Sequence, residues 1–415
     1  MKFRLSMLMV ALLVAGSCST SPAGPSATGS TTTNPVLLSE SLPVTAPTTT
    51  TTFVPDPAVV EQVMASLTLE EKVGQLFMPV MSGSDATSVS SLEGQNNETV
   101  FGPRTPAEIV STYKLGGVIY LTQNIISADQ VGSLSAGLQN AARDETGIGL
   151  LVAVDQEGGR VNRITDGVTV FPPAAILSGD VAAVLEAGYL TGRQVSAQGI
   201  NVVLAPVADI AAAGTEGAIG SRSYGEDPEI VADMVTAAVD GLQGSGVAAA
   251  VKHWPGHGAT QVDSHEELPE IDVTRAAWEV RERVPFEAAI DHDVAIVLVG
   301  HLAIPALDPS GGPATVSPVL IDQLLRDELG FDGVVMTDAL NMHAVSGIDR
   351  GEVVVQAVAA GADILLVPPD LPTAYEAMVT AVESGRLDQA RFDDAVRRVL
   401  TLKQRLGLLP PVSGP

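Results

Sequence analysis

Short apolar, β-branched segments alternate with longer amphipathic stretches from about residue 55 onwards. This alternation is typical of parallel strands joined by helices. The segments that predict strands are 74–79, 117–121, 150–154, 201–205, 248–251, 295–299, 333–336 and 364–367. Apolar residues at helical spacing predict helices over 127–142, 181–198, 230–243, 276–289, 318–329, 352–360 and 391–406. Eight strand–helix units predict an α/β fold, a (β/α)8 TIM barrel spanning residues 55–410.

The positions of ionisable residues favour this barrel over an open, doubly wound sheet. The glycines of the segment 256–258 follow a strand but lead into no helix start, so a phosphate-binding fingerprint is missing. In a TIM barrel the active site is built at the carboxyl ends of the strands. Five of the eight predicted strands end at ionisable residues, which are Asp155, Asp209, Lys252 with His253, His301 and Asp338. We therefore expect a site at this rim.

Composition and charge narrow the class of protein. Hydrophobic residues make up 46% and charged residues 17% of the chain, which is enough apolar material for a sizeable core. Acidic residues outnumber basic ones by 49 to 22, giving a formal net charge of -27. Such a surface repels the phosphate backbone, so nucleic acid is not expected as a partner.

The N-terminal segment has the layout of a secretory signal. Lys2 and Arg4 precede an apolar run over residues 5–14, and small residues follow before Cys18. The run is shorter than the roughly 20 residues that a bilayer span requires. Because Cys18 is the only cysteine and stands at the expected cleavage position, this segment resembles a bacterial lipobox. We expect a lipoprotein signal peptide over residues 1–17 and export to the outer face of the cell membrane, with Cys18 as the lipid anchor.

Residues 18–54 are rich in Ser, Thr and Pro and cannot form a core, so they predict a flexible tether. An ordinary exported protein with an incidental cysteine is the alternative to the lipoprotein interpretation. The anchor would be the only contact of the protein with a membrane.

Three of the six histidines lie between residues 253 and 265, which suggests a site. His253 and His257 have the spacing of a helical zinc pair, with His265 as a third candidate ligand. Pro255 and Gly256 argue against the helix that this pair needs. We therefore expect neither a metal ion nor a cofactor.

Four segments carry a resemblance to a known family. They are KHWPGHG with DSH (252–258 and 263–265), DQEGGRVNR (155–163), RSYGEDP (222–228) and TDALNM (337–342). In this order they are similar to the signature of bacterial, single-domain β-N-acetylglucosaminidases of glycoside hydrolase family 3, over most of residues 56–408. The resemblance implies removal of terminal β-linked N-acetylglucosamine with retention at the anomeric carbon.

Carried over residue by residue, the resemblance implies that Asp338 is the nucleophile and that His265 is the acid and base, oriented by Asp263. An imidazole suits both proton transfers because its ordinary pKa lies near neutral pH. The resemblance also implies five residues that bind the sugar, which are Asp155, Arg163, Arg222, Lys252 and His253.

Several assignments stay open at this level. For Asp338 taken alone, an N-cap of a helix beginning at Ala339 is the alternative. Glu157 is either a sugar ligand or a structural partner of Arg160. His301 is either a wall of the site or a hydrogen-bonded core histidine. The polar insertion at 81–103 either shapes the aglycone side of the site or forms a disordered loop.

Two other functions compete with the hydrolase. The first is a β-N-acetylglucosaminide phosphorylase, which would use phosphate as the acceptor, and the second is a non-catalytic glycan-binding lipoprotein. A two-domain β-glucosidase is disfavoured because the chain ends at Pro415, soon after the last predicted helix. We expect a monomer that acts on GlcNAc-containing glycans, above all muropeptides from peptidoglycan.

Overall fold

The structure is a computed structural model that describes residues 54–211, 219–260, 262, 264 and 266–410. The predicted signal peptide, the tether and the anchor Cys18 lie outside these residues, as do Asp263 and His265. No helix in the described part of the chain is long and apolar enough to cross a membrane.

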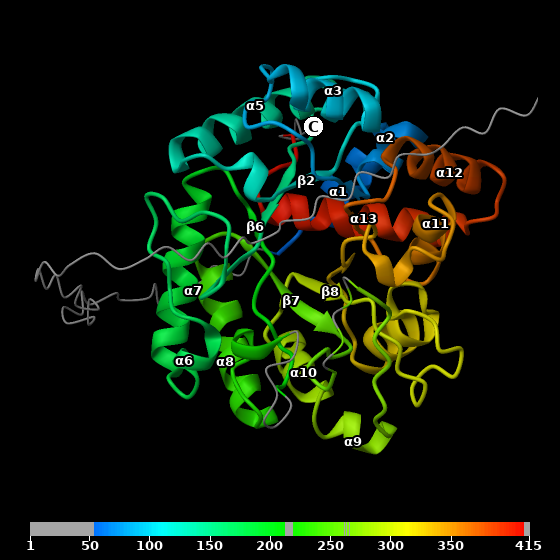
Figure 1. The fold of residues 1–415 in the computed structure, drawn as a ribbon. Helices are drawn as coiled ribbons and strands as arrows, with labels where there is room; N and C mark the ends of the chain where they lie inside the picture. The colour runs from blue at the N-terminus through cyan, green and yellow to red at the C-terminus, as the bar shows by residue number, and fades with distance from the viewer. Residues whose placement is uncertain (1–53, 212–218, 261, 263, 265, 411–415) are drawn as a thin grey trace, which may run out of the picture. The chain divides into compact units, whose positions relative to one another are not determined.

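Each of the eight predicted apolar segments contains a strand. The strands are β1 (Phe77–Met78), β2 (Gly117–Tyr120), β3 (Leu151–Val154), β6 (Val202–Val203), β7 (Ala248–Trp254), β8 (Ile296–Val299), β9 (Val334–Thr337) and β10 (Leu365–Leu366). Within the described residues six of them pair in parallel in the order β2-β3-β6-β7-β8-β9, and β1 pairs in parallel with β10. The fold is therefore a TIM-barrel-like α/β fold, and Figure 1 shows helices α7, α8 and α10 outside the strands.

The helices are α1 (Pro57–Ser66), α2 (Leu69–Gly74), α3 (Ser91–Phe101), α4 (Pro106–Tyr113), α5 (Ala128–Thr146), α6 (Ala174–Leu177), α7 (Val181–Ser196), α8 (Pro228–Gly244), α9 (Arg275–Glu279), α10 (Arg283–Asp291), α11 (Glu352–Ala359), α12 (Leu371–Glu383) and α13 (Gln389–Arg405). A segment of π-helical type, η4 (Val319–Glu328), covers the predicted helix 318–329. Short 3₁₀ turns are η1 (Thr122–Asn124), η2 (Gly220–Arg222), η3 (Ala314–Val316) and η5 (His343–Val345).

The predicted single helix over 276–289 is wrong, because the chain breaks between α9 and α10. The break turns two buried side chains toward the segment that follows β7. The Trp278 indole donates a hydrogen bond to the Pro255 carbonyl at 2.9 Å, and Glu282 lies against Gly256. Contacts to the barrel outweigh the local helical pattern here.

The insertion at 81–103 contains helix α3, which the sequence analysis did not predict. Ser90 and Glu93 form a reciprocal capping box at its start, and this pattern was visible in the sequence. The buried Asn97 side chain holds the ends of the insertion by donating to the carbonyls of Ser82 and Arg104, each at 2.8 Å. The described insertion is therefore an ordered part of the fold.

The DQEGGRVNR segment forms a two-stranded antiparallel hairpin directly after β3. Its strands are β4 (Gln156–Gly158) and β5 (Val161–Asn162). The turn needs Gly158 and Gly159, whose φ angles of 95° and 58° are unfavourable for other residues. This hairpin carries Glu157 and leads to Arg163.

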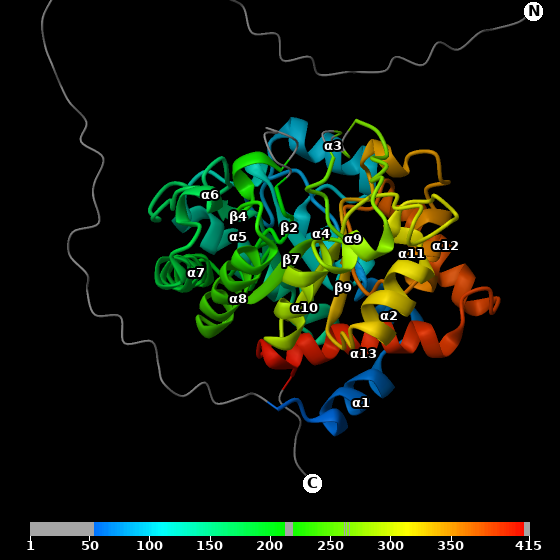
Figure 2. The same ribbon diagram turned by 90° about the horizontal axis from the view of Figure 1, so that it is seen from below.

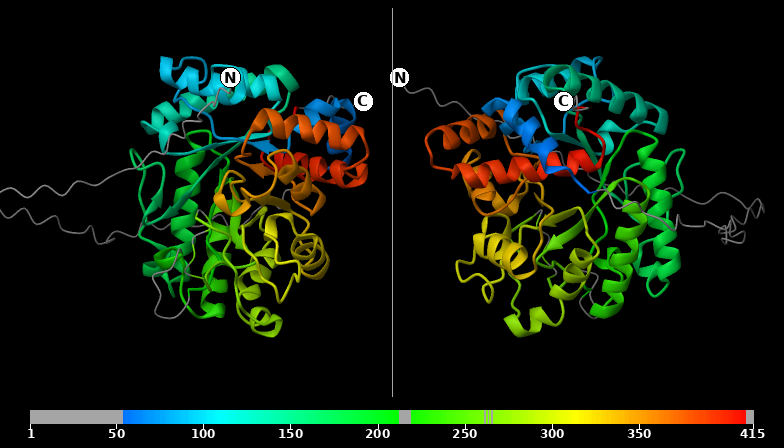
Figure 3. Two further views of the ribbon diagram at one scale, coloured as in Figure 1. Left: turned by 45° about the vertical axis from the view of Figure 1, so that its right-hand side comes forward. Right: turned by 180° about the vertical axis from the view of Figure 1, so that it is seen from behind.

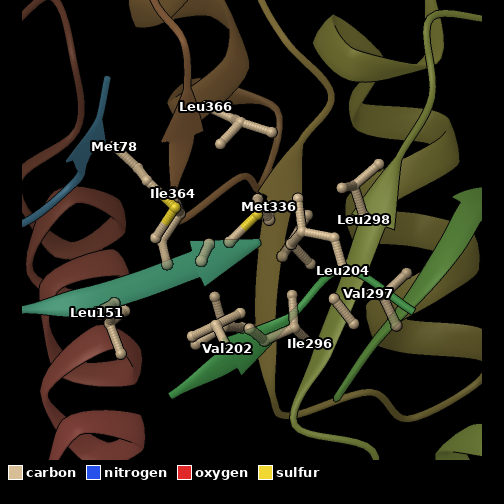
Figure 4. Close-up of a cluster of buried hydrophobic side chains, with 14 of the residues drawn as sticks. Met78, Leu151, Val202, Leu204, Ile296, Val297, Leu298, Met336, Ile364 and Leu366 are labelled. Carbon is tan, nitrogen blue, oxygen red and sulfur yellow. The ribbon is translucent and has the colours of Figure 1, made fainter. Parts of the chain in front are cut away.

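Apolar side chains from many strands fill the interior. Figure 4 shows Val202, Ile296, Met336 and Ile364 pointing toward one another between the strands, and each is at most 1% exposed. These β-branched and long side chains form the layered packing that is typical of barrel interiors.

The first and last helices pack against each other. Figure 2 shows α1 beside α13, and the Arg397 guanidinium donates to the Glu61 carboxylate at 2.6 Å across this contact. Figure 3 shows α12 next to α2, where the Tyr375 hydroxyl donates to the Glu70 carbonyl at 2.6 Å. The start and end of the barrel are thus joined by side-chain contacts.

Lys403 of α13 is fully buried, and its ammonium donates to Gln75 Oε1 at 2.5 Å, just before β1. Burial lowers the pKa of this lysine from 10.5 to about 7. The folded protein therefore holds a largely neutral amine at alkaline pH.

We predict that Lys403→Met raises the free energy of unfolding at pH 7 by about 2 kcal/mol, after allowing for the loss of Gln75's partner. Between pH 7 and 10.5 the unfolded lysine binds a proton that the folded one lacks, so the stability of the wild type rises with pH in this window. The variant lacks this rise, so the difference in free energy of unfolding between variant and wild type should shrink toward pH 10. Urea unfolding of both proteins at pH 7 and 9.5 measures this difference. An equal difference at both pH values would contradict the prediction.

Candidate active site

The carboxyl ends of several strands bring charged side chains together. Asp155 follows β3, Lys252 and His253 lie near the end of β7, and Asp338 follows β9. Arg222 reaches the same place from η2 after β6. The expected site at this rim is therefore assembled from segments far apart in sequence.

Lys252 is the centre of this cluster. Its ammonium is buried and lies 3.0 Å from Asp155 Oδ1 and 2.7 Å from Glu157 Oε1. Burial alone would lower the pKa of Lys252, but the two carboxylates hold it above its ordinary value. Arg163 completes the group by donating to Asp155 Oδ2 at 3.1 Å. Burial acts to raise the pKa of Asp155, but Lys252 and Arg163 together lower it below its ordinary value, so this carboxyl stays ionised.

Glu157 binds Arg222 with both carboxylate oxygens, each 2.8 Å from the guanidinium. Although burial acts to raise it, the pKa of Glu157 is held at about 2, chiefly by Lys252 and then by Arg222. The structural partners of Glu157 are Lys252 and Arg222 instead of Arg160, and its role as a sugar ligand stays an open alternative. The Arg160 guanidinium donates to the Ile219 carbonyl at 3.2 Å.

Asp209 and His253 form a buried dyad that the sequence analysis did not assign. His253 Nδ1 lies 2.6 Å from Asp209 Oδ2, and Asp209 is fully buried at the end of the β6 segment. Burial would raise the pKa of Asp209, but the imidazole beside it keeps this pKa at about 2. On the other side of the ring, His253 Nε2 lies 3.5 Å from Arg222 Nη2. The only sequence signal for Asp209 was its position at a strand end.

His257 lies buried behind His253, with the two rings edge to face and their centroids 5.9 Å apart. Burial lowers the pKa of His257. Its Nε2 lies 3.4 Å from Ser264 Oγ. Among the described residues no group of three or more His, Cys, Asp or Glu side chains could hold a metal ion, and the third candidate ligand, His265, lies outside them.

Asp338 is partly buried at the end of β9, and its Oδ1 accepts the backbone N–H of Ala339 at 2.7 Å. Burial acts to raise the pKa of Asp338, but His301, His253 and Lys252 lower it, in that order of strength. The carboxylate is therefore ionised. No helix begins at Ala339, so the N-cap alternative is wrong.

His301 has the contacts of a hydrogen-bonded core histidine, one of its two predicted roles, and its role as a wall of the site stays a prediction. It is fully buried, its Nδ1 lies 2.6 Å from Thr315 Oγ1, and its Nε2 donates to the Ala339 carbonyl at 3.0 Å. Ala339 directly follows Asp338 in the chain, and among the neighbouring groups His301 lowers the pKa of Asp338 the most. The predicted acid and base His265 and its partner Asp263 lie outside the described residues.

A cavity of about 50 Å³ lies behind the Glu157–Arg222 pair, between the β4–β5 hairpin and helices α7 and α8. Apolar residues such as Phe171 and Val184 make up much of its wall. Among the described residues of the charged cluster, Glu157 and Arg222 line this cavity, whereas Lys252, His253 and Asp338 do not.

Comparison with known proteins places the chain in a family. The model of the glycosyl hydrolase family 3 N terminal domain matches residues 68–402. The chain is 33% identical over 333 residues to β-hexosaminidase A of Pseudoalteromonas piscicida and 34% identical over 308 residues to a β-hexosaminidase of Nitrosomonas eutropha. These alignments cover 73% and 70% of this chain. A solved family 3 β-N-acetylglucosaminidase from Paenibacillus sp. str. FPU-7 aligns with 84% of this chain at 40% identity and a TM-score of 0.76.

The chain therefore belongs to glycoside hydrolase family 3, and the predicted family is confirmed. It spans 56% of the Pseudoalteromonas protein and 65% of the Paenibacillus chain, but 86% of the Nitrosomonas protein.

We predict that Glu157→Gln lowers the free energy of unfolding by about 2 kcal/mol, because Lys252 and Arg222 lose a charged partner in a buried site. Since the pKa of Glu157 is about 2 in the folded protein and 4.5 ordinarily, the stability it contributes is full above pH 4.5 and is lost as the pH falls toward 2. Melting temperatures of both proteins between pH 3 and 7 test this. Glu287→Gln, which breaks a surface pair with Arg283, is the control and should cost less than about 0.5 kcal/mol.

Proposed function

We propose that this chain is a retaining β-N-acetylglucosaminidase, an exo-hydrolase that removes terminal β-linked N-acetylglucosamine. The observation that carries the proposal is the ionised carboxylate of Asp338, which directly follows strand β9 at the rim that also holds Lys252 and His253. The names of the relatives, β-hexosaminidase and β-N-acetylglucosaminidase, support this substrate class.

In the proposed mechanism Asp338 attacks the anomeric carbon while the glycosidic oxygen leaves with a proton from His265. Water then gives a proton to His265 and attacks the same carbon, which breaks the bond to Asp338 and restores both groups. Asp263 is proposed to orient His265. Two displacements at one carbon retain its configuration.

The sugar-binding roles proposed for the charged cluster agree with the donors it leaves available. Lys252 has three N–H donors and uses two on Asp155 and Glu157. Arg222 directs Nε and Nη2 to Glu157, so Nη1 is left for a substrate oxygen. Arg163 and Asp155 form the next pair along the rim. Fixed donors and acceptors of this kind are suited to bind sugar hydroxyls.

We also propose that the eight strands close into a complete barrel. Closure needs β1 to meet β2 and β9 to meet β10, the two neighbouring pairs that the strand order lacks. A backbone hydrogen bond supports closure at each of these two places. The Ile119 N–H donates to the Pro79 carbonyl at 3.1 Å, and the Thr337 N–H donates to the Ile364 carbonyl at 2.9 Å.

We predict that the protein hydrolyses 4-nitrophenyl β-N-acetylglucosaminide with retention, and that Asp338→Ala lowers kcat/KM roughly a thousand-fold because the nucleophile is lost. His265→Ala should also lose activity by orders of magnitude, and a chelator should have no effect. Asp332→Ala, at an exposed position two residues before β9, is the matched control and should keep wild-type activity. NMR of the first-formed sugar reports its configuration, and inversion would contradict the mechanism.

The natural substrate is proposed to be GlcNAc linked to muramic or anhydromuramic acid in peptidoglycan fragments. Mass spectrometry of such substrates, with buffer phosphate varied, tests this together with the acceptor. Free N-acetylglucosamine at every phosphate concentration supports the hydrolase, whereas a sugar 1-phosphate identifies a phosphorylase. Binding of the fragments without turnover would identify a glycan-binding protein.

We propose that the protein is an exported lipoprotein anchored through Cys18, supported by the charged, apolar and small-residue order of residues 1–18. We predict that Cys18→Ser moves the protein from the membrane fraction to the soluble fraction and abolishes labelling by a palmitate analogue. Unchanged membrane association of the variant would contradict the anchor. Gel filtration of the Cys18→Ser protein tests the proposed monomer.

A further inference from the structure

Asp209 lies where three segments meet. The backbone carbonyl of Asp209 accepts the Ser223 hydroxyl at 2.7 Å, and Ser223 follows Arg222 in the chain. Its Oδ1 accepts the backbone N–H groups of His253 at 3.2 Å and His257 at 2.7 Å. Asp209 is therefore held by the turn that carries Arg222 and by the end of β7.

The turn after β7 approaches Asp209 closely enough that only glycine fits at one position. A Cβ atom on Gly258 would lie 1.8 Å from the carbonyl oxygen of Ile210, the residue after Asp209. This contact places the His257 N–H on the Asp209 carboxylate. The carboxylate position is thus fixed by packing as well as by hydrogen bonds.

The two oxygens of Asp209 have separate partners. Oδ1 accepts the two backbone N–H groups, whereas Oδ2 lies 2.6 Å from His253 Nδ1. An ionised carboxylate can only accept, so Nδ1 carries the proton. His253 Nε2 faces Arg222 Nη2 at 3.5 Å, and a guanidinium can only donate. Asp209 therefore requires the proton on Nδ1, and Arg222 requires Nε2 to be an unprotonated acceptor.

We propose that Asp209 is a positioning residue that holds His253 as the Nδ1–H tautomer. The single lone pair of Nε2, which faces Arg222 only across a long 3.5 Å contact, is then available to accept a hydroxyl group of the sugar in place of that contact. The proposal rests on the proposed glycosidase function for its activity test. It explains why a fully buried carboxylate lies directly behind the His253 ring. A histidine with the opposite tautomer would direct N–H toward the donors of Arg222.

Asp209→Asn separates the positioning role from the structural one. The amide oxygen can replace Oδ1 and keep both backbone bonds, but the amide nitrogen that replaces Oδ2 can only donate. His253 Nδ1 must then accept, and the ring proton moves to Nε2. Asp363→Asn is the matched control, because Asp363 is another fully buried aspartate, paired with Arg326 and Arg391 away from this cluster.

With 4-nitrophenyl β-N-acetylglucosaminide we expect Asp209→Asn to lower kcat/KM by about 10- to 100-fold, mainly through KM, as a reversed hydrogen bond leaves a polar group unpaired. In a His253→Gln background the same substitution should cost less than about threefold, because the effect of Asp209 passes through the ring. Asp363→Asn should lower the melting temperature and leave kcat/KM unchanged. An equal loss from Asp209→Asn in both backgrounds, or no loss in either, would overturn the proposal.

Nitrogen-15 NMR of histidine-labelled protein tests the tautomer without any activity. The His253 signals, assigned by their absence in His253→Gln, should show a protonated Nδ1 and an unprotonated Nε2 in the wild type and the reverse in Asp209→Asn. A protonated Nε2 in the wild type overturns the proposal, even if Asp209→Asn does not fold. If the wild type shows the expected tautomer but no hydrolysis, the proposed function fails while the positioning role of Asp209 stands.

Discussion

The organisation of the site depends on one buried ammonium, that of Lys252. Removing such a charge from water costs several kcal/mol unless it is paired and hydrogen-bonded. Asp155 and Glu157 supply that pairing, and Glu157 in turn fixes Arg222 with both oxygens. These ion pairs therefore join strand β7, the β4–β5 hairpin and the turn at η2, and the groups proposed to bind the sugar take their positions from this network.

The same network prepares the carboxylate of Asp338 for chemistry. Burial favours its protonated form, but His301, His253 and Lys252 reverse this preference. The carboxylate is thus anionic in the folded protein, as the proposed nucleophile requires. In the proposed mechanism, binding and reactivity are coupled, because Lys252 and His253 are proposed to hold the sugar and also lower the pKa of Asp338.

Short apolar, β-branched runs predicted the strands, and apolar residues at helical spacing predicted helices α5, α7, α8, α11 and α13. Helices α1, α2, α3, α4, α6 and α12 were not predicted. The break between α9 and α10 was missed because it depends on contacts with the turn after β7. The partners of Glu157 were also missed, since Arg222 lies 65 positions and Lys252 lies 95 positions further along the chain. Asp209 carried no motif of its own, so its role became visible only when the fold placed it behind His253.

Contact between the two ends of the barrel constrains the order in which the chain can fold. Strand β1 pairs with β10, Phe77 opposite Leu365, and Gln75 meets Lys403 across 328 positions of sequence. During synthesis β1 and α1 are made first, whereas their partners β10 and α13 are made last. Closing such long loops is slow, so early apolar surface stays open to unwanted association until the final helix is complete.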